Sequence, residues 1–205
     1  MKEKILILID VQNDFISGSL KNNIAESKIQ NIVKKIKDFT GNHIFVTKDT
    51  HYDDYMRTRE GVKLPVKHCI EGTWGWELHT DVSKALSEWL EQDKVKRIVH
   101  YITKHTFGSY DLAAIIDELD GEEKEIDMCG FCTDICVISN ALILKERMYD
   151  NAEIHVYDDC CAGVTEGTHN AALTVMESCQ INVHWHEDKY GNEERPKLEW
   201  NVKNV

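Results

Sequence analysis

The sequence predicts an α/β protein with a three-layer, Rossmann-like fold, in which helices flank a six-stranded parallel sheet. Short apolar runs rich in β-branched residues alternate along the chain with longer stretches whose apolar residues recur at helical spacing. The chain of 205 residues is long enough for one such core, and no internal repeat or Pro/Gly/Ser-rich linker divides it. We therefore expect one domain over residues 1–187 and a C-terminal tail over residues 188–205.

Six apolar segments are expected to form the sheet. The expected strands span residues 4–10, 43–49, 97–104, 124–130, 152–159 and 180–185. The stretches between them are long enough for helical crossovers, which parallel strands require. We therefore expect the six strands to be parallel.

Helices are expected between the strands because apolar residues there lie about one helical turn apart. The expected buried positions are Ile24, Ile29, Ile32, Val33 and Ile36, then Val82, Ala85, Leu86 and Trp89, then Leu112, Ile115, Ile116 and Leu119, and finally Ala171, Ala172, Val175 and Met176. A further helix is expected over residues 134–148. Residues 50–75 show no such pattern, and a loop of that length inside a compact domain is usually functional.

The charge balance argues against two classes of partner. A net charge of −12, with 24 basic residues that form no cluster, repels nucleic acid and anionic membrane surfaces. The apolar run at residues 5–9 is too short for a signal peptide or a membrane span, and no other run approaches a spanning length. Seven cysteines, an odd number without an export signal, favour reduced thiols. We expect a soluble, cytoplasmic protein.

Charged residues stand where predicted strands end. Ligands of open parallel sheets bind beyond the carboxyl ends of the strands, and there lie Asp10, Asp49, Lys104 and the turn at 130–136. Asp10 is either a general base at a partly desolvated strand end or a turn residue. Lys104 either pairs with a carboxylate and stabilises a developing anion, or is a solvated charge.

Three cysteines lie in the stretch MCGFCTDICVISN: Cys129, Cys132 and Cys136. Cys136 begins an apolar helix that Thr133 or Asp134 is available to cap, and a helix N-terminus lowers the pKa of a thiol and binds oxyanions. This favours a nucleophile at Cys136. The spacing C-x2-C-x3-C also allows a zinc or iron–sulfur site, or a redox pair of Cys129 and Cys132.

The long loop offers a second group of functional side chains. Asp49, His51 and His68 provide one carboxylate and two imidazoles, a ligand set that suits Zn²⁺, Mn²⁺ or Fe²⁺, and Glu60 is a candidate fourth ligand. Ten histidines in the chain produce such pairs by chance, so the spacing alone is a weak signal. The cofactor expected from this set is one divalent metal ion.

Taken together, these segments resemble the isochorismatase-like cysteine hydrolases, and the long loop resembles the nicotinamidase branch. The resemblance runs from about residue 4 to 185. It rests on IDVQNDF, TKDTH, LPVKHCIEGTWG, TKHTFGS and GFCTDICV, followed by DDCCAGVT and HNAAL. One departure is that several nicotinamidases carry Trp-Pro shortly before the second metal histidine, where this chain has Leu64 and Pro65 and only Trp74 or Trp76 nearby.

The resemblance implies a catalytic triad and an oxyanion hole. Cys136 would be the nucleophile, Asp10 the base that takes its proton, and Lys104 the cation that balances the charge. A cis peptide bond would precede Cys132, whose backbone N–H would bind the oxyanion together with that of Cys136. The thiol of Cys132 would be incidental, and Cys129 would fill the core.

The resemblance also implies a substrate. Phe15 would pack on a substrate ring, with Tyr110 or else Phe107 as a second wall, and the metal would bind the pyridine nitrogen. The implied reaction converts nicotinamide and water to nicotinate and ammonia through a thioester, in a homo-oligomer. The alternatives are hydrolysis of a carbamoyl or ureido amide or of isochorismate, and, in another class, a non-enzymatic thiol or metal-binding protein.

Overall fold

The computed structural model describes residues 2–92, 96–121 and 123–186. The predicted tail at 188–205 lies outside these residues, so the predicted domain boundary stays a prediction. No helix in the described ranges has both the length and the apolarity needed to cross a membrane.

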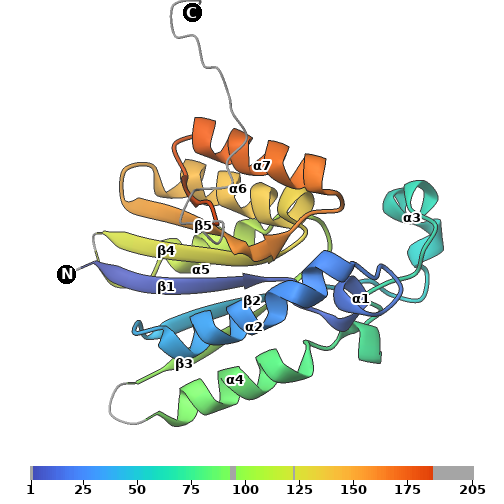
Figure 1. The fold of residues 1–205 in the computed structure, drawn as a ribbon, viewed down its shortest axis with the longest axis horizontal. Helices are drawn as coiled ribbons and strands as arrows, with labels where there is room; N and C mark the ends of the chain where they lie inside the picture. Colours follow the sequence, from blue (N-terminus) through green and yellow to red (C-terminus); the bar gives the residue numbers. More distant parts are fainter. Residues whose placement is uncertain (1, 93–95, 122, 187–205) are drawn as a thin grey trace, which may run out of the picture.

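The described residues form the predicted parallel sheet of six strands (Figure 1). The strands are β1 (Glu3–Ile9), β2 (His43–Asp49), β3 (Ile98–Lys104), β4 (Lys124–Phe131), β5 (Ala152–Ala162) and β6 (Asn182–His184). The strand order is β3-β2-β1-β4-β5-β6, and every neighbouring pair is parallel. All six strands were predicted; β5 is three residues longer than expected, because its last residues pair with the end of β4 after a register shift.

Helices cover both faces of the sheet, as the three-layer prediction requires. The helices are α1 (Asn13–Ile16), α2 (Asn23–Asp38), α3 (Arg59–Lys63), α4 (Thr80–Glu91), α5 (Tyr110–Asp117), α6 (Ile138–Met148) and α7 (Glu166–Ser178). In Figure 1, α2 and α4 lie on one side of the sheet and α6 and α7 on the other. Because the chain winds outward from β1 to β3 and then crosses back to β4, the strand order reverses between β1 and β4. In such sheets this reversal opens a ligand-binding crevice at the carboxyl ends.

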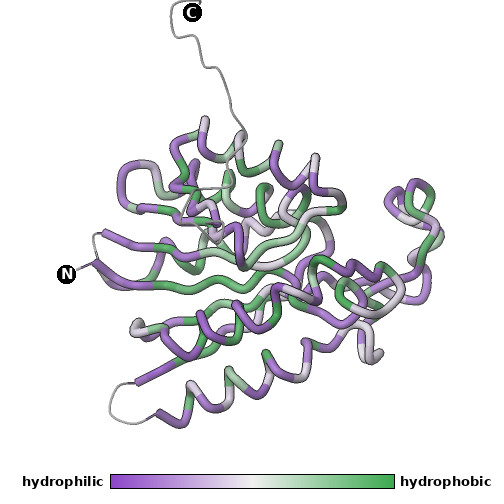
Figure 2. Tube along the Cα trace, in the orientation of Figure 1, coloured by the Kyte–Doolittle hydropathy of each residue, from purple (hydrophilic) through white to green (hydrophobic). Residues whose placement is uncertain are grey.

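The core is centred on β1, where residues 5–9 are fully buried because both faces of the strand are covered. Figure 2 shows the apolar colouring concentrated on the central strands and the inner helix faces. In α7 the predicted face is wrong in part: Ala171 and Val175 are exposed, and the helix instead buries His169, Ala172, Leu173 and Met176. The buried stripe therefore includes a polar histidine, which hydropathy spacing could not identify.

Two other predicted core positions are solvent-exposed. Ile24 is 43% exposed in the first turn of α2, and Ile115 is 37% exposed in α5. Each lies on the margin of its helical stripe, next to a buried residue, Ala25 or Ile116. Periodicity gives the centre of a buried face more accurately than its edges.

The long loop is not structureless. It contains the 3₁₀ turns Tyr55–Arg57 and Trp74–Trp76 and the short helix α3. In Figure 1, α1 and α3 lie beyond the carboxyl end of β1, and α3 stands apart from the helical layers. The loop therefore extends from the edge of the sheet at which the sequence placed the functional residues.

Candidate active site

A mainly apolar cavity of about 280 Å³ opens at the carboxyl ends of β1 and β4. Its lining residues are Phe15, Leu20, Lys21, Asn22, Asp49, Glu60, Leu64, His68, Phe107, Cys132, Ile135, Cys136 and Val164. Predicted residues from the cysteine turn and from the metal-ligand set thus face one space. A pocket with apolar walls and a few convergent polar groups is the usual form of a small-molecule site.

The three predicted catalytic side chains meet below this cavity. Lys104 Nζ lies 2.6 Å from Asp10 Oδ2 and 3.5 Å from Cys136 Sγ, and it donates to the Thr106 carbonyl at 3.1 Å. Asp10 follows β1 with φ of 49°, a left-handed conformation that aspartate tolerates better than most residues, and its Oδ1 accepts the Thr47 hydroxyl at 2.6 Å. All three are at most 5% exposed, so the ion pair is shielded from water.

The charges of this group follow from its burial. Burial raises the pKa of Asp10, although the Lys104 ammonium opposes the rise. Burial acts to lower the pKa of Lys104, but Asp10 and the other anionic neighbours outweigh it and raise that pKa, so Lys104 stays charged. Burial raises the pKa of the Cys136 thiol, and the Asp10 carboxylate adds to the rise. The expected lowering of this thiol pKa by a helix N-terminus is therefore wrong, since burial beside carboxylates dominates.

Cys136 lies in a π-helical turn, Thr133–Val137, that precedes α6. The peptide bond between Phe131 and Cys132 is cis, as the resemblance implied. The Cys132 carbonyl accepts the N–H groups of Ile135 and Val137 at 3.1 and 3.0 Å, which closes the turn around Cys136. The capping prediction is wrong: neither Thr133 nor Asp134 caps this helix, because both side chains bond to the segment after β5.

A glycine permits the close approach of the two strands that carry the site. Gly130 has φ of 130°, and a Cβ there would lie 2.0 Å from the Ile9 carbonyl oxygen. No other residue fits between β1 and β4 at this point. Gly130 thus brings Asp10, after β1, close to the turn that follows β4.

The predicted metal ligands converge beside the ion pair. One ligand atom each from Asp49, His51 and His68 lies within 4.8 Å of the others. Asp49 Oδ2 is 3.1 Å from His51 Nε2 and 3.5 Å from His68 Nε2, and Glu60 Oε1 is 3.6 and 3.8 Å from the same two nitrogens. His68 donates Nδ1–H to the Val66 carbonyl at 2.9 Å, which leaves the Nε2 lone pair facing the cluster. A buried carboxylate and two imidazoles oriented in this way fit a divalent cation.

Asp49 belongs to both groups. Its Oδ2 faces the histidines, while its Oδ1 lies 3.4 Å from Lys104 Nζ. The histidines and Lys104 offset the effect of burial on this carboxyl, and its pKa is held well below the usual range. A single carboxylate therefore connects the metal-ligand set to the catalytic ion pair.

The IDVQNDF segment anchors the metal loop through residues to which sequence reasoning assigned no role. Gln12 is fully buried; its side chain accepts the Asp49 N–H at 2.8 Å and donates to the Asp49 carbonyl at 2.9 Å. Asp14 accepts the Cys69 N–H at 2.7 Å, and the Cys69 carbonyl accepts the His51 N–H at 2.9 Å. The available sequence signal was that Gln12 and Asp14 are polar residues directly after a buried apolar strand.

Of the aromatic residues predicted to contact the substrate, some line the cavity and others do not. Phe15 and Phe107 line the cavity, and the Phe15 ring packs edge-on against His68 with centroids 5.8 Å apart. Tyr110 does not line it: it is 80% exposed at the first position of α5, where its side chain points to solvent. Trp74 is 61% exposed and outside the lining as well.

The three clustered cysteines do not converge as ligands. Within the described ranges, Asp49, His51 and His68 form a group that could hold a metal ion, and no such group contains a cysteine. Cys129 is fully buried in β4 with Sγ directed at the Ile7 carbonyl, as a core residue, whereas Cys132 lines the cavity. The zinc and iron–sulfur interpretation of C-x2-C-x3-C is therefore wrong, whereas the incidental role of the Cys132 thiol stays a prediction.

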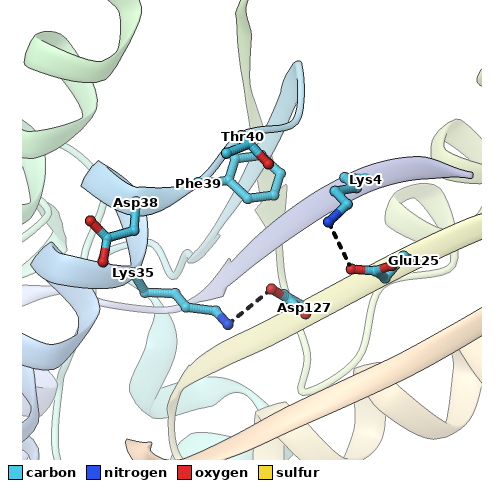
Figure 3. A pocket seen from close by; sticks show the side chains of 7 residues that line it. All are labelled: Lys4, Lys35, Asp38, Phe39, Thr40, Glu125 and Asp127. Atoms are coloured by element: carbon cyan, nitrogen blue, oxygen red, sulfur yellow. Dashed lines mark ion pairs between the residues drawn. The ribbon is translucent and has the colours of Figure 1, made fainter.

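Another hollow lies among the first residues of β1 and β4 and the end of α2, away from the strand carboxyl ends (Figure 3). Two ion pairs fill it: Lys35 with Asp127 at 2.9 Å and Lys4 with Glu125 at 3.3 Å. The Lys35 ammonium also lies over the Tyr157 ring. The Lys35 pair joins α2 to β4, and the Lys4 pair joins β1 to β4.

The fold and the site together define a hydrolytic enzyme of the α/β class, with a thiol at the switch point of its sheet. The isochorismatase domain model matches residues 4–188. The chain belongs to the isochorismatase family.

Relatives and solved structures are consistent with this assignment. The chain is 26% identical to a nicotinamidase/pyrazinamidase of Mycobacterium tuberculosis, over 88% of this chain and 97% of that protein. It is 23% identical to the nicotinamidase of Escherichia coli, over 86% and 91% of the two chains. The fold is similar to that of a pyrazinamidase of Pyrococcus horikoshii in complex with zinc, with a TM-score of 0.71, 24% identity and coverage of 89% and 98%.

Proposed function

We propose that this protein is a metal-containing amidohydrolase that converts nicotinamide and water to nicotinate and ammonia. The observation that carries the proposal is that Cys136 and the metal ligands Asp49 and His68 line one cavity of about 280 Å³. A flat aromatic amide has one end for a nucleophile and another for a metal, and a cavity with apolar walls between the two suits it. The names of the relatives support the same activity.

The first half of the reaction forms a thioester. Asp10 takes the proton of the Cys136 thiol, and the sulfur attacks the amide carbonyl carbon. The backbone N–H groups of Cys132 and Cys136 donate to the oxyanion of the tetrahedral intermediate. Asp10 then returns its proton to the amide nitrogen, the C–N bond breaks, and ammonia leaves.

The second half releases the acid. Asp10, again a carboxylate, takes a proton from water, and the hydroxide adds to the thioester carbonyl. The C–S bond breaks, and Asp10 returns its proton to the departing Cys136 sulfur. Asp10 Oδ2 lies 2.6 Å from Lys104 Nζ, so the ammonium is beside the carboxylate in both transfers. Lys104 stays protonated throughout and offsets the negative charge that moves between Asp10 and Cys136.

A divalent cation bound by Asp49, His51 and His68, with Glu60 beside them, would supply a Lewis acid for the ring nitrogen of the substrate. The protein side of this contact is preorganised: Gln12 fixes the backbone of Asp49, and the Val66 carbonyl orients His68. Phe15 forms one wall against the ring.

The experiment is an amide panel scored by ammonia release from purified protein. Nicotinamide should be hydrolysed, activity should fall after chelation, and Zn²⁺, Mn²⁺ or Fe²⁺ should restore it. Release from a ureido or carbamoyl amide in place of nicotinamide would assign the other amidase activity considered from the sequence. Absence of release from nicotinamide with every metal would refute the proposal.

A further inference from the structure

Two side chains of the turn that carries Cys136 are held from outside the catalytic group. Thr133 Oγ1 is 2.8 Å from His169 Nδ1, and both carboxylate oxygens of Asp134 lie 3.1 Å from the Val164 N–H. His169 and Val164 belong to the segments DDCCAGVT and HNAAL, to which the reaction assigns no part.

His169 is itself fixed on its other side. It is 8% exposed, and its Nε2 lies 2.8 Å from Asp158 Oδ1. A carboxylate only accepts hydrogen bonds, so Nε2 carries a proton, and in the neutral imidazole Nδ1 accepts the Thr133 hydroxyl proton. Asp158 is held in turn, because its Oδ2 accepts the His186 N–H at 3.1 Å and its carbonyl accepts the Lys28 ammonium at 3.1 Å.

The packing leaves this imidazole little freedom. A Cβ on Gly163 would lie 2.8 Å from the His169 Cβ, so the glycine permits the backbone after β5 to pass directly against the histidine. Thr133, at the other end of the contact, is fully buried. A buried hydrogen bond between two fixed partners sets the position of the backbone that carries it.

We propose that His169 is a positioning residue for the nucleophile: anchored by Asp158, it holds Thr133 and so fixes the π-helical turn three residues before Cys136. The inference rests on the proposed function only in that Cys136 is the nucleophile. Displacing a reacting group by about 1 Å costs on the order of 100-fold in rate, so loss of this contact should lower kcat by about 10- to 100-fold.

Two amide substitutions separate positioning from simple support of the fold. The amide of asparagine reaches the position of Nδ1 in histidine, and that of glutamine reaches the position of Nε2. His169→Asn therefore keeps a partner for Thr133 and loses Asp158, whereas His169→Gln keeps a partner for Asp158 and loses Thr133. We expect His169→Asn to retain most of kcat and His169→Gln to lose it, with little change in KM for either.

The hydroxyl partner gives a second, independent pair of variants. Thr133→Ser keeps the hydroxyl and should resemble the wild type, while the isosteric Thr133→Val should show the same loss in kcat as His169→Gln. If both substitutions remove one contact, the double variant should lose no more than either single variant. His155→Gln, which changes another hydrogen-bonded histidine remote from the turn, serves as control and should leave activity unchanged.

A readout without substrate separates this inference from the proposed function. The rate at which iodoacetamide alkylates Cys136, followed by peptide mass spectrometry, should fall in parallel with kcat in His169→Gln and Thr133→Val. The dissociation constant for Zn²⁺ should not change, since neither residue contacts the metal ligands. If nicotinamide is not hydrolysed but the alkylation pattern holds, the proposed function fails and the positioning role stands. Wild-type alkylation and turnover in His169→Gln and Thr133→Val, or equal losses in His169→Asn and His169→Gln, would overturn the role.

Discussion

The three cysteines of the stretch MCGFCTDICVISN differ in what surrounds each sulfur. Cys136 Sγ lies 3.5 Å from a buried ammonium, Cys132 lines the cavity, and Cys129 is enclosed in β4. Only the first has a partner that stabilises a thiolate. The same residue type thus has three environments within eight positions of sequence.

Substitution of each cysteine should therefore have an unequal effect. Cys136→Ala should abolish turnover, because it removes the thiol that lies beside the Lys104 ammonium. Cys132→Ala keeps the backbone N–H and should retain kcat within about threefold while changing KM, since only a cavity wall is altered. Cys129→Ala should retain activity and lose about 1 kcal/mol of unfolding free energy through core packing.

Steady-state kinetics and urea unfolding of the three variants provide the measurements. Equal loss of turnover from all three substitutions would contradict the assignment. Retention of turnover by Cys136→Ala would remove this residue from the mechanism.

At the residue scale, the sequence identified the groups that carry charge but not their supports. Asp10, Lys104 and Asp49 were predictable because a charged residue directly after an apolar strand is unusual and its location in the fold is fixed. Gln12 and Asn140 were not predictable, since each side chain bonds to backbone groups more than 30 residues away in the sequence. Tyr110 was misplaced because sequence gives the position of an aromatic residue but not the direction of its side chain.

At the scale of elements, Asn140 joins α6 to the loop after β3. It is fully buried; its Oδ1 accepts the Ser109 N–H at 3.0 Å, and its Nδ2 donates to the carbonyls of Cys136 and Phe107 at 2.8 and 3.1 Å. One amide therefore fixes the nucleophile turn relative to a wall of the cavity.

Asn140→Asp keeps the acceptor and removes both donors, leaving the Cys136 and Phe107 carbonyls beside a carboxylate. We expect a loss of about 2 to 3 kcal/mol in unfolding free energy and a higher KM, as the Phe107 loop is released. Urea denaturation measures the first effect and kinetics the second. Asn31→Asp is the matched control, since that exposed amide also donates to a backbone carbonyl, at 2.8 Å; an equal effect in both variants would refute the prediction.

The junction of β5 and α7 should respond to acid. Burial acts to raise the pKa of Asp158, but the hydrogen bonds from His169 and the His186 backbone outweigh it, and the pKa is lowered from 3.8. The Lys28 ammonium of α2, which donates to the Asp158 carbonyl, also acts to lower this pKa. Because the folded pKa lies below the unfolded one, the stabilisation is complete above pH 3.8 and is lost as the pH falls through the folded value.

Asp158→Asn should therefore remove part of the acid dependence of stability. Urea unfolding of the wild type and the variant between neutral pH and the onset of acid unfolding should show a difference that shrinks as the pH falls below 3.8. A difference that grows with acidity would show that the sign of the shift is wrong.

For the whole molecule, the metal should contribute to stability as well as to substrate binding. A ligand at 100 times its dissociation constant stabilises the folded state by about 2.7 kcal/mol, and for a domain of this size 1 kcal/mol shifts Tm by roughly 2 to 4 °C. We expect a chelator to lower the Tm of metal-loaded protein by about 5 to 10 °C. His68→Ala should lose this response; a wild-type Tm that chelation does not change would argue against a resident metal.

The sheet and its helical layers were predictable from the sequence, while the fold of the long loop and the cavity were not. Apolar β-branched runs separated by helical crossovers allow few arrangements, so the three layers followed from pattern alone. The fold of residues 50–75 did not follow, because the loop is fixed by bonds from Gln12 to Asp49 and from Asp14 to Cys69, which local periodicity does not reveal. The cavity needed the assembled chain, since its walls come from distant segments.

Because the loop is anchored at both ends, we expect that the segment between the anchors can be replaced. Gln12 clamps the backbone at Asp49 and Asp14 clamps it at Cys69, so the intervening stretch is fastened at both ends to the segment that also carries Asp10. Insertions or replacements between Tyr52 and Val66 would change the shape and width of the cavity entrance. The bonds of Gln12 and Asp14 would keep the catalytic and metal-binding residues in place. New substrate selectivity is best sought by grafting there, with Glu60 retained.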